Sequence, residues 1–308
     1  MSLKVLRDPS GSKVDIVFVH GWHGDQAPWT SAQNSVFWPE KLLAAKIPEA
    51  RILSFEYDVT IEAFWNEEDL VSDFSNDLMD ALMEQRTKKE EENRAVILVA
   101  HCLGGLVCEK ALATGSQHDE RKKLVSCVQG LLLLGTPHFQ PDTLPAAMKY
   151  FQLAQKEIPK DSELKERSQW VISIPQQFAS LRKSGAQISV ECFYEGSAMS
   201  VNDDNVKIVD MFLAQCLDGP PPDRLGGNHQ QISQFESDNN RDFIKVSRVL
   251  VRWVAKIPSP EKKGTVNYIA NARFSGENHG MQLGQNAGTI SGFRFGERTR
   301  TSSANGSA

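Results

Sequence analysis

Length, composition and charge limit what this chain can be. It has 308 residues, of which 40% are hydrophobic and 24% charged, and a formal net charge of -5. That length suits one large α/β domain with a short appendage. No strongly basic block is present to neutralise phosphates, so the sequence argues against nucleic-acid binding.

Cysteine usage and the N-terminal sequence together predict a cytoplasmic protein. The cysteines are odd in number and scattered, mostly within apolar runs: Cys102, Cys108, Cys127, Cys192 and Cys216. This pattern indicates reduced thiols rather than a disulfide framework. The N-terminal sequence lacks the apolar core of a signal peptide, and no stretch is long and apolar enough to span a bilayer.

Short apolar runs alternate with longer segments of helical period. Runs that are apolar at nearly every position suit strands covered on both faces. The predicted strands are residues 14–20, 50–58, 94–100, 128–136 and 187–195, and the predicted helices are residues 67–86, 104–113 and 239–256. This alternation predicts a doubly wound, mostly parallel α/β sheet.

The stretch 137–170 interrupts the alternation with an aromatic helix, AAMKYFQLAQKEI, and a charged run. Two interpretations stay open at this point. The stretch either caps the carboxyl edge of the sheet, where it would help to gate a substrate, or is an ordinary crossover helix.

The segment AVILVAHCLGG, residues 95–105, predicts the nucleophile of an enzyme. A strand that feeds through a sharp turn directly into a helix leaves the middle residue of the turn exposed at the top of the sheet, and crowding requires small neighbours. Cys102 holds that position, with Ala100 and Gly104 as the small neighbours. Orphan N–H groups at the helix N-terminus favour a thiolate there. We therefore expect Cys102 to attack an acyl carbon, whereas the other cysteines are expected to be small buried side chains.

The remaining members of a catalytic triad are predicted from chain order. His229, in GGNHQQISQF, follows the last predicted strand and precedes the terminal helix. In enzymes whose nucleophile lies on a strand-to-helix turn, the general base has this place in the chain order. Glu195 ends a strand at its carboxyl edge, which suits a side chain that orients the imidazole. Three aspartates just beyond it are the alternatives for the triad acid: Asp203, Asp204 and Asp210.

The segment VFVHGWHGD, residues 17–25, predicts an oxyanion hole. The backbone N–H of Gly21 or Trp22 is expected to pair with that of Leu103 around a developing oxyanion. Nearby histidines are expected to be supporting hydrogen-bond donors rather than bases: His20, His23 and His101. The chain has no closely spaced Cys and His set and no phosphate-binding glycine loop, so neither a metal site nor a cofactor is expected.

Several of these segments resemble the successive blocks of lipase-like α/β hydrolases related to GPI inositol-deacylases. The resemblance is carried by VFVHGWHGD, FWPEKLLAAKIPEARILSFEYD, VAHCLGGLVCEKAL, GLLLLGTPH, FYE and NHQQISQF, which span roughly residues 14–255 in family order. They are most similar to the fungal branch found beside or fused to NOD-like receptors. The resemblance implies the α/β-hydrolase fold and action on a lipid or other ester.

One residue departs from the family pattern, which usually reads H-S-L-G-G. Here the pattern is His101, Cys102, Leu103, Gly104 and Gly105. A thiolate in a site shaped for serine can still form an acyl-enzyme, yet it can also hydrolyse esters poorly. A natural cysteine enzyme, an engineered exchange and a decayed site therefore stay open as alternatives.

The C-terminal region differs in character from the body. The predicted organisation is a hydrolase body at 1–256, a linker at 257–264, an amyloid-like motif at 265–298 and a disordered end at 299–308. Within the motif, glycines recur at every fourth position from Gly276 to Gly296, so in a strand they share one face. Stacked copies in register would align Asn and Gln amides as cross-β fibrils do.

This tail resembles the SesB-type motif of fungal death-pathway proteins. The resemblance implies self-assembly through residues 271–296, templated by a matching segment of a NOD-like receptor, with membrane recruitment after activation. The simpler interpretation is a flexible glycine-rich tail. Two functions follow as hypotheses: a hydrolase that acts as a cell-death effector, or an inactive hydrolase-fold adaptor that signals through its tail.

Overall fold

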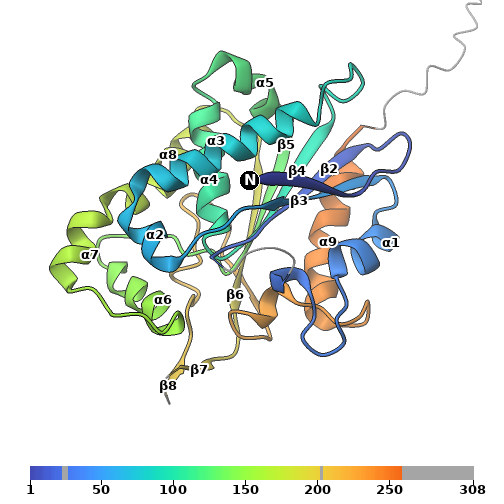
Figure 1. Cartoon of the computed structure of the whole chain (residues 1–308). Helices are drawn as coiled ribbons and strands as arrows, with labels where there is room; N and C mark the ends of the chain where they lie inside the picture. The colour runs from blue at the N-terminus through green and yellow to red at the C-terminus, as the bar shows by residue number, and fades with distance from the viewer. Residues whose placement is uncertain (23–26, 202–203, 259–308) are drawn as a thin grey trace, which may run out of the picture. The chain divides into compact units, whose positions relative to one another are not determined.

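A seven-stranded sheet organises the described part of the chain, which in this computed structural model comprises residues 1–22, 27–201 and 204–258. The strand order is β1-β3-β2-β4-β5-β6-β9 (Figure 1). Only the β1–β3 pair is antiparallel. The strands are β1 Ser2–Arg7, β2 Val14–Val19, β3 Ala50–Glu56, β4 Ala95–His101, β5 Val128–Leu134, β6 Ser189–Glu195 and β9 Asp223–Leu225, and β7 Met199–Val201 with β8 Asp204–Val206 form a separate hairpin. The predicted mostly parallel sheet is confirmed.

The continuous apolar runs of the inner strands reflect burial on both faces. In β2 every residue is buried, and successive side chains enter different clusters. Val17 and Val19 belong to the cluster that contains Phe74 and Leu106, whereas Ile16 and Phe18 belong to the other cluster, with Val246 and Leu250 of the terminal helix. The strand period of two thus divides one run between two cores.

Helices cover both faces of the sheet (Figure 1). One face carries α3 Glu68–Glu84, α4 Gly104–Gly115, α5 Asp119–Cys127 and α8 Gln169–Lys183, and the other carries α1 Ala44–Lys46 and α9 Arg241–Lys256. Shorter elements are η1 Ala27–Trp29, η2 Pro39–Leu43, α2 Ile61–Asn66, η3 Leu144–Ala147, α6 Met148–Leu153, α7 Asp161–Arg167 and η4 Gln231–Ser233. The predicted helices correspond to α3, α4 and α9.

The terminal helix α9 shows how sequence fixes its bounds. The Asn240 side chain accepts hydrogen bonds from the N–H groups of Asp242 and Phe243, so the helix begins at a capped residue. The apolar face expected of this helix is buried: Phe243, Val246, Leu250 and Val254. In α3 the expected face is buried as well, except that Leu70 is half-buried.

The stretch 137–170 is not one helix. It contains η3, the short α6 and α7, so the expected aromatic helix at 146–158 ends already at Leu153. α8 and the edge strand β1 were not expected. The predicted boundaries of the tail segments at 257–264, 265–298 and 299–308 stay predictions, because residues 259–308 lie outside the described part of the chain.

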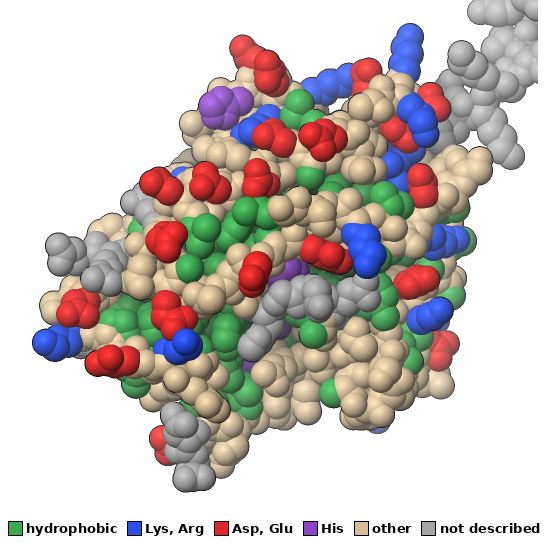
Figure 2. Space-filling view, viewed as in Figure 1, with side chains coloured by type: hydrophobic (Ala, Val, Ile, Leu, Met, Phe, Trp, Pro, Cys, Tyr) green, Lys and Arg blue, Asp and Glu red, His purple; other side chains and the backbone are tan. Residues whose placement is uncertain are grey.

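Charged side chains of both signs are dispersed over the face of the molecule shown in Figure 2. Acidic groups are spread along this face together with Lys and Arg, and hydrophobic side chains lie between them. Among the described residues, no helix combines the length and the apolar composition that a membrane crossing requires.

Candidate active site

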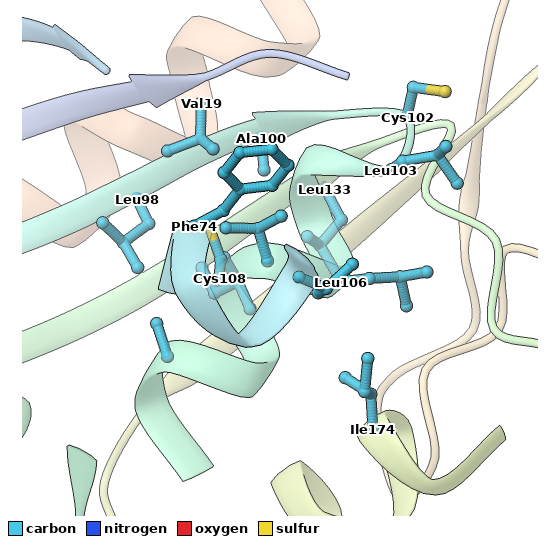
Figure 3. Packing of buried hydrophobic residues seen from close by; sticks show 14 of the residues in the cluster. Val19, Phe74, Leu98, Ala100, Cys102, Leu103, Leu106, Cys108, Leu133 and Ile174 are labelled. Carbon is cyan, nitrogen blue, oxygen red and sulfur yellow. The ribbon is translucent and has the colours of Figure 1, made fainter. Parts of the chain in front are cut away.

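Cys102 occupies the sharp turn between β4 and α4. Its backbone φ is +56°, in the left-handed region that non-glycine residues rarely adopt. The Cys102 N–H donates a hydrogen bond of 2.9 Å to the Leu134 carbonyl, which ties the turn to β5. Figure 3 shows the Cys102 side chain directed away from the side chains of Phe74, Cys108 and Leu106. This backbone and direction are those of a nucleophile elbow.

Two glycines beside the turn are required by close approach of backbone. A Cβ built on Gly104 would lie 2.1 Å from the His20 carbonyl oxygen, which cannot move aside as a flexible side chain would. A Cβ on Gly21 would lie 2.7 Å from the Cβ of Cys102 and 3.2 Å from its sulfur. The end of β2 and the start of α4 are therefore in direct contact around the thiol.

The structure brings Cys102, His229 and Glu195 together. Cys102 and His229 line one pocket. His229 Nδ1 lies 3.4 Å from Glu195 Oε1, and Glu195 is the last residue of β6. All three side chains are buried, with 1%, 1% and 0% of their surface exposed. The exposure expected of Cys102 at the top of the sheet is therefore wrong, because Leu153 of α6 and other side chains line the pocket at the thiol. The order of the groups is thiol, imidazole and carboxylate, as a catalytic triad requires.

The Glu195–His229 contact is longer than a well-formed hydrogen bond. Within the described part of the chain, both ring nitrogens of His229 and Glu195 Oε2 are buried without a geometrically formed hydrogen bond, while Glu195 Oε1 accepts from the Val209 N–H. Catalytic contacts are commonly loose before substrate binds.

The aspartates that were alternatives to Glu195 lie in other settings. Asp210 Oδ1 accepts hydrogen bonds from the N–H groups of Phe212 and Leu213, which fixes a turn. Asp204 is exposed on β8. Asp203 lies outside the described residues. Of the described carboxylates that were considered, Glu195 is therefore the one beside the imidazole.

His20 and His101 support the neighbouring backbone. The His20 Nε2 accepts from the Tyr57 N–H at 3.3 Å, so its Nδ1 is the donor to the Gly21 carbonyl at 2.7 Å. His101 Nε2 lies 2.9 Å from the His229 carbonyl oxygen. Both rings thus hold backbone on either side of Cys102, which agrees with the supporting role expected of them. His23 lies outside the described residues.

The residues predicted for the oxyanion hole lie next to the thiol. Gly21 and Trp22 line the same pocket as Cys102, and Leu103 stands at the N-cap of α4 with 1% of its surface exposed. The first turn of a helix leaves its N–H groups without intrahelical acceptors. These N–H groups are suited to stabilise the oxyanion of the tetrahedral intermediate that forms when Cys102 attacks an acyl carbon.

The pocket at Cys102 is narrow and is closed on one side by α6. Its cavity volume is only about 20 Å³, and its apolar lining includes Trp22, Pro28 and Leu153. The Tyr150 ring, also on α6, stands 5.9 Å from the His229 ring at an interplanar angle of 85°. Of the two interpretations of residues 137–170, these contacts favour the cap, because α6 contributes to the site itself.

Tyr150 is a site residue that the sequence analysis did not single out. Its side chain is fully buried, and its hydroxyl has no hydrogen-bond partner among the described residues. Burial raises the pKa of Tyr150 well above its usual value, and the charges of Cys102 and Glu195 raise it further. The only signal in the sequence is the aromatic character of the stretch around it.

The imidazole of His229 is expected to stay protonated at neutral pH. Burial lowers its pKa, but the charges of Cys102 and Glu195 beside the ring raise it to about 10. Because this folded-state pKa exceeds the ordinary value of about 6.5, the resulting stability is fully present below about pH 6.5 and is lost as pH rises through about 10.

A nitrogen-15 NMR titration of the histidine rings measures this pKa directly. We expect Cys102→Ala to lower the pKa of His229, because the exchange removes the negative partner, and Cys127→Ala to leave it unchanged. A His229 ring that titrates at the same pH in the wild-type chain and in Cys102→Ala would contradict a thiolate–imidazolium pair.

Comparisons with known proteins agree with this geometry. A family model described as PGAP1-like alpha/beta domain matches residues 10–180, and a model described as SesB domain on fungal death-pathway protein matches residues 266–292, which lie outside the described residues. Both parts of the resemblance stated from the sequence are thereby confirmed. The predicted α/β-hydrolase fold is confirmed as well.

Individual relatives are more distant. Protein SERAC1 of Danio rerio is 30% identical over 145 residues, which cover 41% of this chain and 22% of that protein. Protein SERAC1 of Bos taurus is 26% identical over 176 residues, which cover 49% of this chain and 26% of that protein. The chain thus spans about a quarter of the length of these curated relatives. The crystal structure of Bacillus licheniformis lipase BlEst2 in mature form matches at 19% identity and a TM-score of 0.51, covering 81% of this chain and 97% of that one. The similarity to the lipase concerns the fold.

Proposed function

Because the chain belongs to the PGAP1-like alpha/beta domain family, we propose that it hydrolyses carboxylic esters with the Cys102 thiol as nucleophile. The single observation that carries this proposal is the placement of Cys102, at a φ of +56°, in one pocket with His229, whose ring lies 3.4 Å from Glu195. A structural cysteine has no need of a left-handed turn or of a buried imidazole and carboxylate beside it.

The proposed reaction proceeds through an acyl-enzyme. The Cys102 thiolate attacks the acyl carbon, and the carbonyl electron pair moves onto an oxyanion held by the N–H groups of Leu103 and of Gly21 or Trp22. When the C–O bond breaks, the His229 imidazolium gives its proton to the leaving alkoxide. His229 then takes a proton from water, the hydroxide attacks the thioester, and the acid and the free thiolate are released.

The pocket lining favours an apolar acyl group, so a lipid ester is the proposed substrate class. Trp22, Pro28 and Leu153 surround the thiol. A cavity of about 20 Å³ is far below the usual range for a drug-sized ligand, about 300–1,000 Å³. We therefore propose that α6 moves outward when substrate enters, as caps of lipid-acting enzymes do when an interface opens them.

Labelling of the wild-type chain tests this proposal. A fluorescent thiol-directed acyl probe should modify one cysteine, Cys102, because this thiol lines the pocket beside His229. Peptide mass spectrometry identifies the modified residue, and turnover of p-nitrophenyl esters of increasing chain length reports hydrolysis. Labelling spread evenly over the cysteines, with no turnover, would contradict the proposed chemistry.

The C-terminal motif supports a role as a cell-death effector. We propose that residues 271–296 assemble in cross-β register on a matching N-terminal segment of a NOD-like receptor, and that assembly concentrates the hydrolase body at membranes. Damage to membrane lipids would then cause death of the cell. Before activation the protein would reside in the cytoplasm. The match at residues 266–292 and the recurrence of glycine at every fourth position support this proposal.

A second candidate function is a non-enzymatic adaptor, favoured by the cysteine at the usual serine position. Fibril seeding separates tail-driven assembly from the chemistry of the body. We expect the full chain to convert to dye-binding fibrils when seeds of residues 265–298 are added, and a chain ending at Pro258 to stay soluble with the same seeds. If the full chain also ignores the seeds, templated assembly fails for both candidate functions; fibrils without any ester turnover would favour the adaptor.

A further inference from the structure

A second cluster of reactive side chains lies away from Cys102, among residues that the proposed hydrolysis does not use. Glu109 is on α4, His138 follows β5, and Cys216 precedes β9. Their ligand atoms all lie within 4.8 Å of one another. The exposed fractions are 0%, 2% and 1%, so the cluster is enclosed by protein.

The contacts of His138 fix the orientation of its ring. Nδ1 lies 3.1 Å from the Ala214 carbonyl oxygen, to which it can donate only as N–H. Nε2 then faces Glu109 Oε1 at 3.0 Å. A histidine that binds a metal typically donates its other ring N–H to a backbone carbonyl or carboxylate, which orients the ring and fixes the tautomer. His138 has that arrangement.

Two features of the cluster are not explained by a simple ion pair of Glu109 and His138. Glu109 Oε2 is buried and has no hydrogen-bond partner among the described residues, which leaves a carboxylate oxygen unsatisfied. Cys216 Sγ lies 3.9 Å from Glu109 Oε1. An ion pair of Glu109 and His138 does not need this thiol.

We propose that Glu109, His138 and Cys216 form a zinc site. Carboxylate, imidazole and thiolate are the ligands that Zn²⁺ binds in proteins. In a tetrahedral site with bonds of about 2.0–2.3 Å, neighbouring ligand atoms lie roughly 3.3–3.8 Å apart. The distances of 3.0 Å and 3.9 Å in this cluster need only small adjustments to reach that range.

Charge and protons balance at such a site. The Glu109 carboxylate and the Cys216 thiolate together neutralise Zn²⁺, so a buried site formed with neutral His138 carries no net charge. Binding releases the Cys216 proton and any second proton on the His138 ring to solvent. The ion would bind the Glu109 carboxylate either through both oxygens, which satisfies Oε2, or through a single oxygen.

The position of the cluster determines which elements of the fold a bound ion would join. The ion would join α4, the loop after β5 and the segment before β9. This inference is independent of the proposed ester hydrolysis, since none of its ligands belongs to the pocket at Cys102.

Metal analysis of the full chain tests the site. After incubation with ZnCl₂ and gel filtration, we expect about one zinc ion per chain. Substitution with CoCl₂ should produce the visible absorption of tetrahedral Co²⁺ together with a thiolate-to-metal charge-transfer band. Cys216→Ala and Glu109→Gln should weaken binding at least about 100-fold. Cys102→Ala and Cys127→Ala are the matched controls and should keep both the zinc and the spectrum.

The wild-type stoichiometry decides the outcome even where a variant does not fold. Less than about 0.1 zinc ion per chain, with no thiolate-to-cobalt band, would overturn the proposal. Full zinc binding by Cys216→Ala would overturn the assignment of the ligands. Loss of zinc binding in Cys102→Ala would indicate that the ion binds at the Cys102 thiol instead. Chelation should also lower the melting temperature of the wild-type chain by about 5 °C or more.

Discussion

Cys102→Ala is expected to lower ester turnover by at least about 10³-fold, because removal of a nucleophile that acts with a base and an oxyanion hole eliminates the covalent pathway. Cys102→Ser is expected to raise turnover above that of the wild-type chain. Its oxygen suits a site whose family usually carries serine, and the oxygen-ester acyl-enzyme is hydrolysed by water that the same imidazole activates. The measurement is kcat/KM for a p-nitrophenyl ester of each purified variant.

Cys127→Ala is the matched control for these variants, since Cys127 is also a buried cysteine but lies at the end of α5, outside the pocket. It should retain wild-type turnover. Equal turnover by the wild-type chain and Cys102→Ala would exclude Cys102 as the nucleophile. If Cys102→Ser folds and gains nothing, the rest of the site is not competent, and the adaptor function becomes the better account.

The second large effect is expected at the imidazole and its carboxylate partner. His229→Gln should lower kcat by about 10³–10⁴-fold, because the chain loses the group that protonates the leaving alkoxide and activates water. Glu195→Gln should lower kcat by roughly 10²–10⁴-fold, since glutamine can hold the ring but cannot stabilise the imidazolium. Steady-state kinetics across a pH series measures both effects.

Asp204→Asn is the matched control for Glu195→Gln. Asp204 was an alternative triad acid, yet it is exposed on β8, so its exchange should change kcat less than about twofold. Removing His229 leaves the Glu195 carboxylate buried without its partner, which costs about 3–5 kcal/mol, so circular dichroism must establish that each variant is folded. A folded Glu195→Gln with wild-type kcat, alongside an impaired Asp204→Asn, would reverse the assignment of the acid.

The inner strands could be predicted because burial on both faces leaves a continuous apolar run, as in β2 and β4. The edge strand β1 could not, because Ser2–Arg7 is largely exposed and its sequence carries no such run. β9 has only three residues, Asp223–Leu225, too few for any period to show. Tertiary contact with neighbouring strands, rather than local preference, determines both.

The residues of the candidate site could likewise be predicted from the sequence only in part. Cys102 could be predicted because its chemistry depends on a local turn, and His229 because its place in chain order is characteristic. Tyr150 could not be predicted, since its contact with His229 depends on how α6 packs. The cluster of Glu109, His138 and Cys216 was missed for the same reason: the separations of 29 and 107 residues conceal a proximity that only the folded chain creates.

The left-handed backbone at residue 102 also limits which amino acids evolution can place there. A φ of +56° is strained for any residue with a branched Cβ, so threonine, which serves as a nucleophile in other hydrolases, is disfavoured at this turn. Serine and cysteine fit equally well, and a single base change interconverts their codons. Lineages that share this fold can therefore alternate between oxygen and sulfur chemistry without rebuilding the turn.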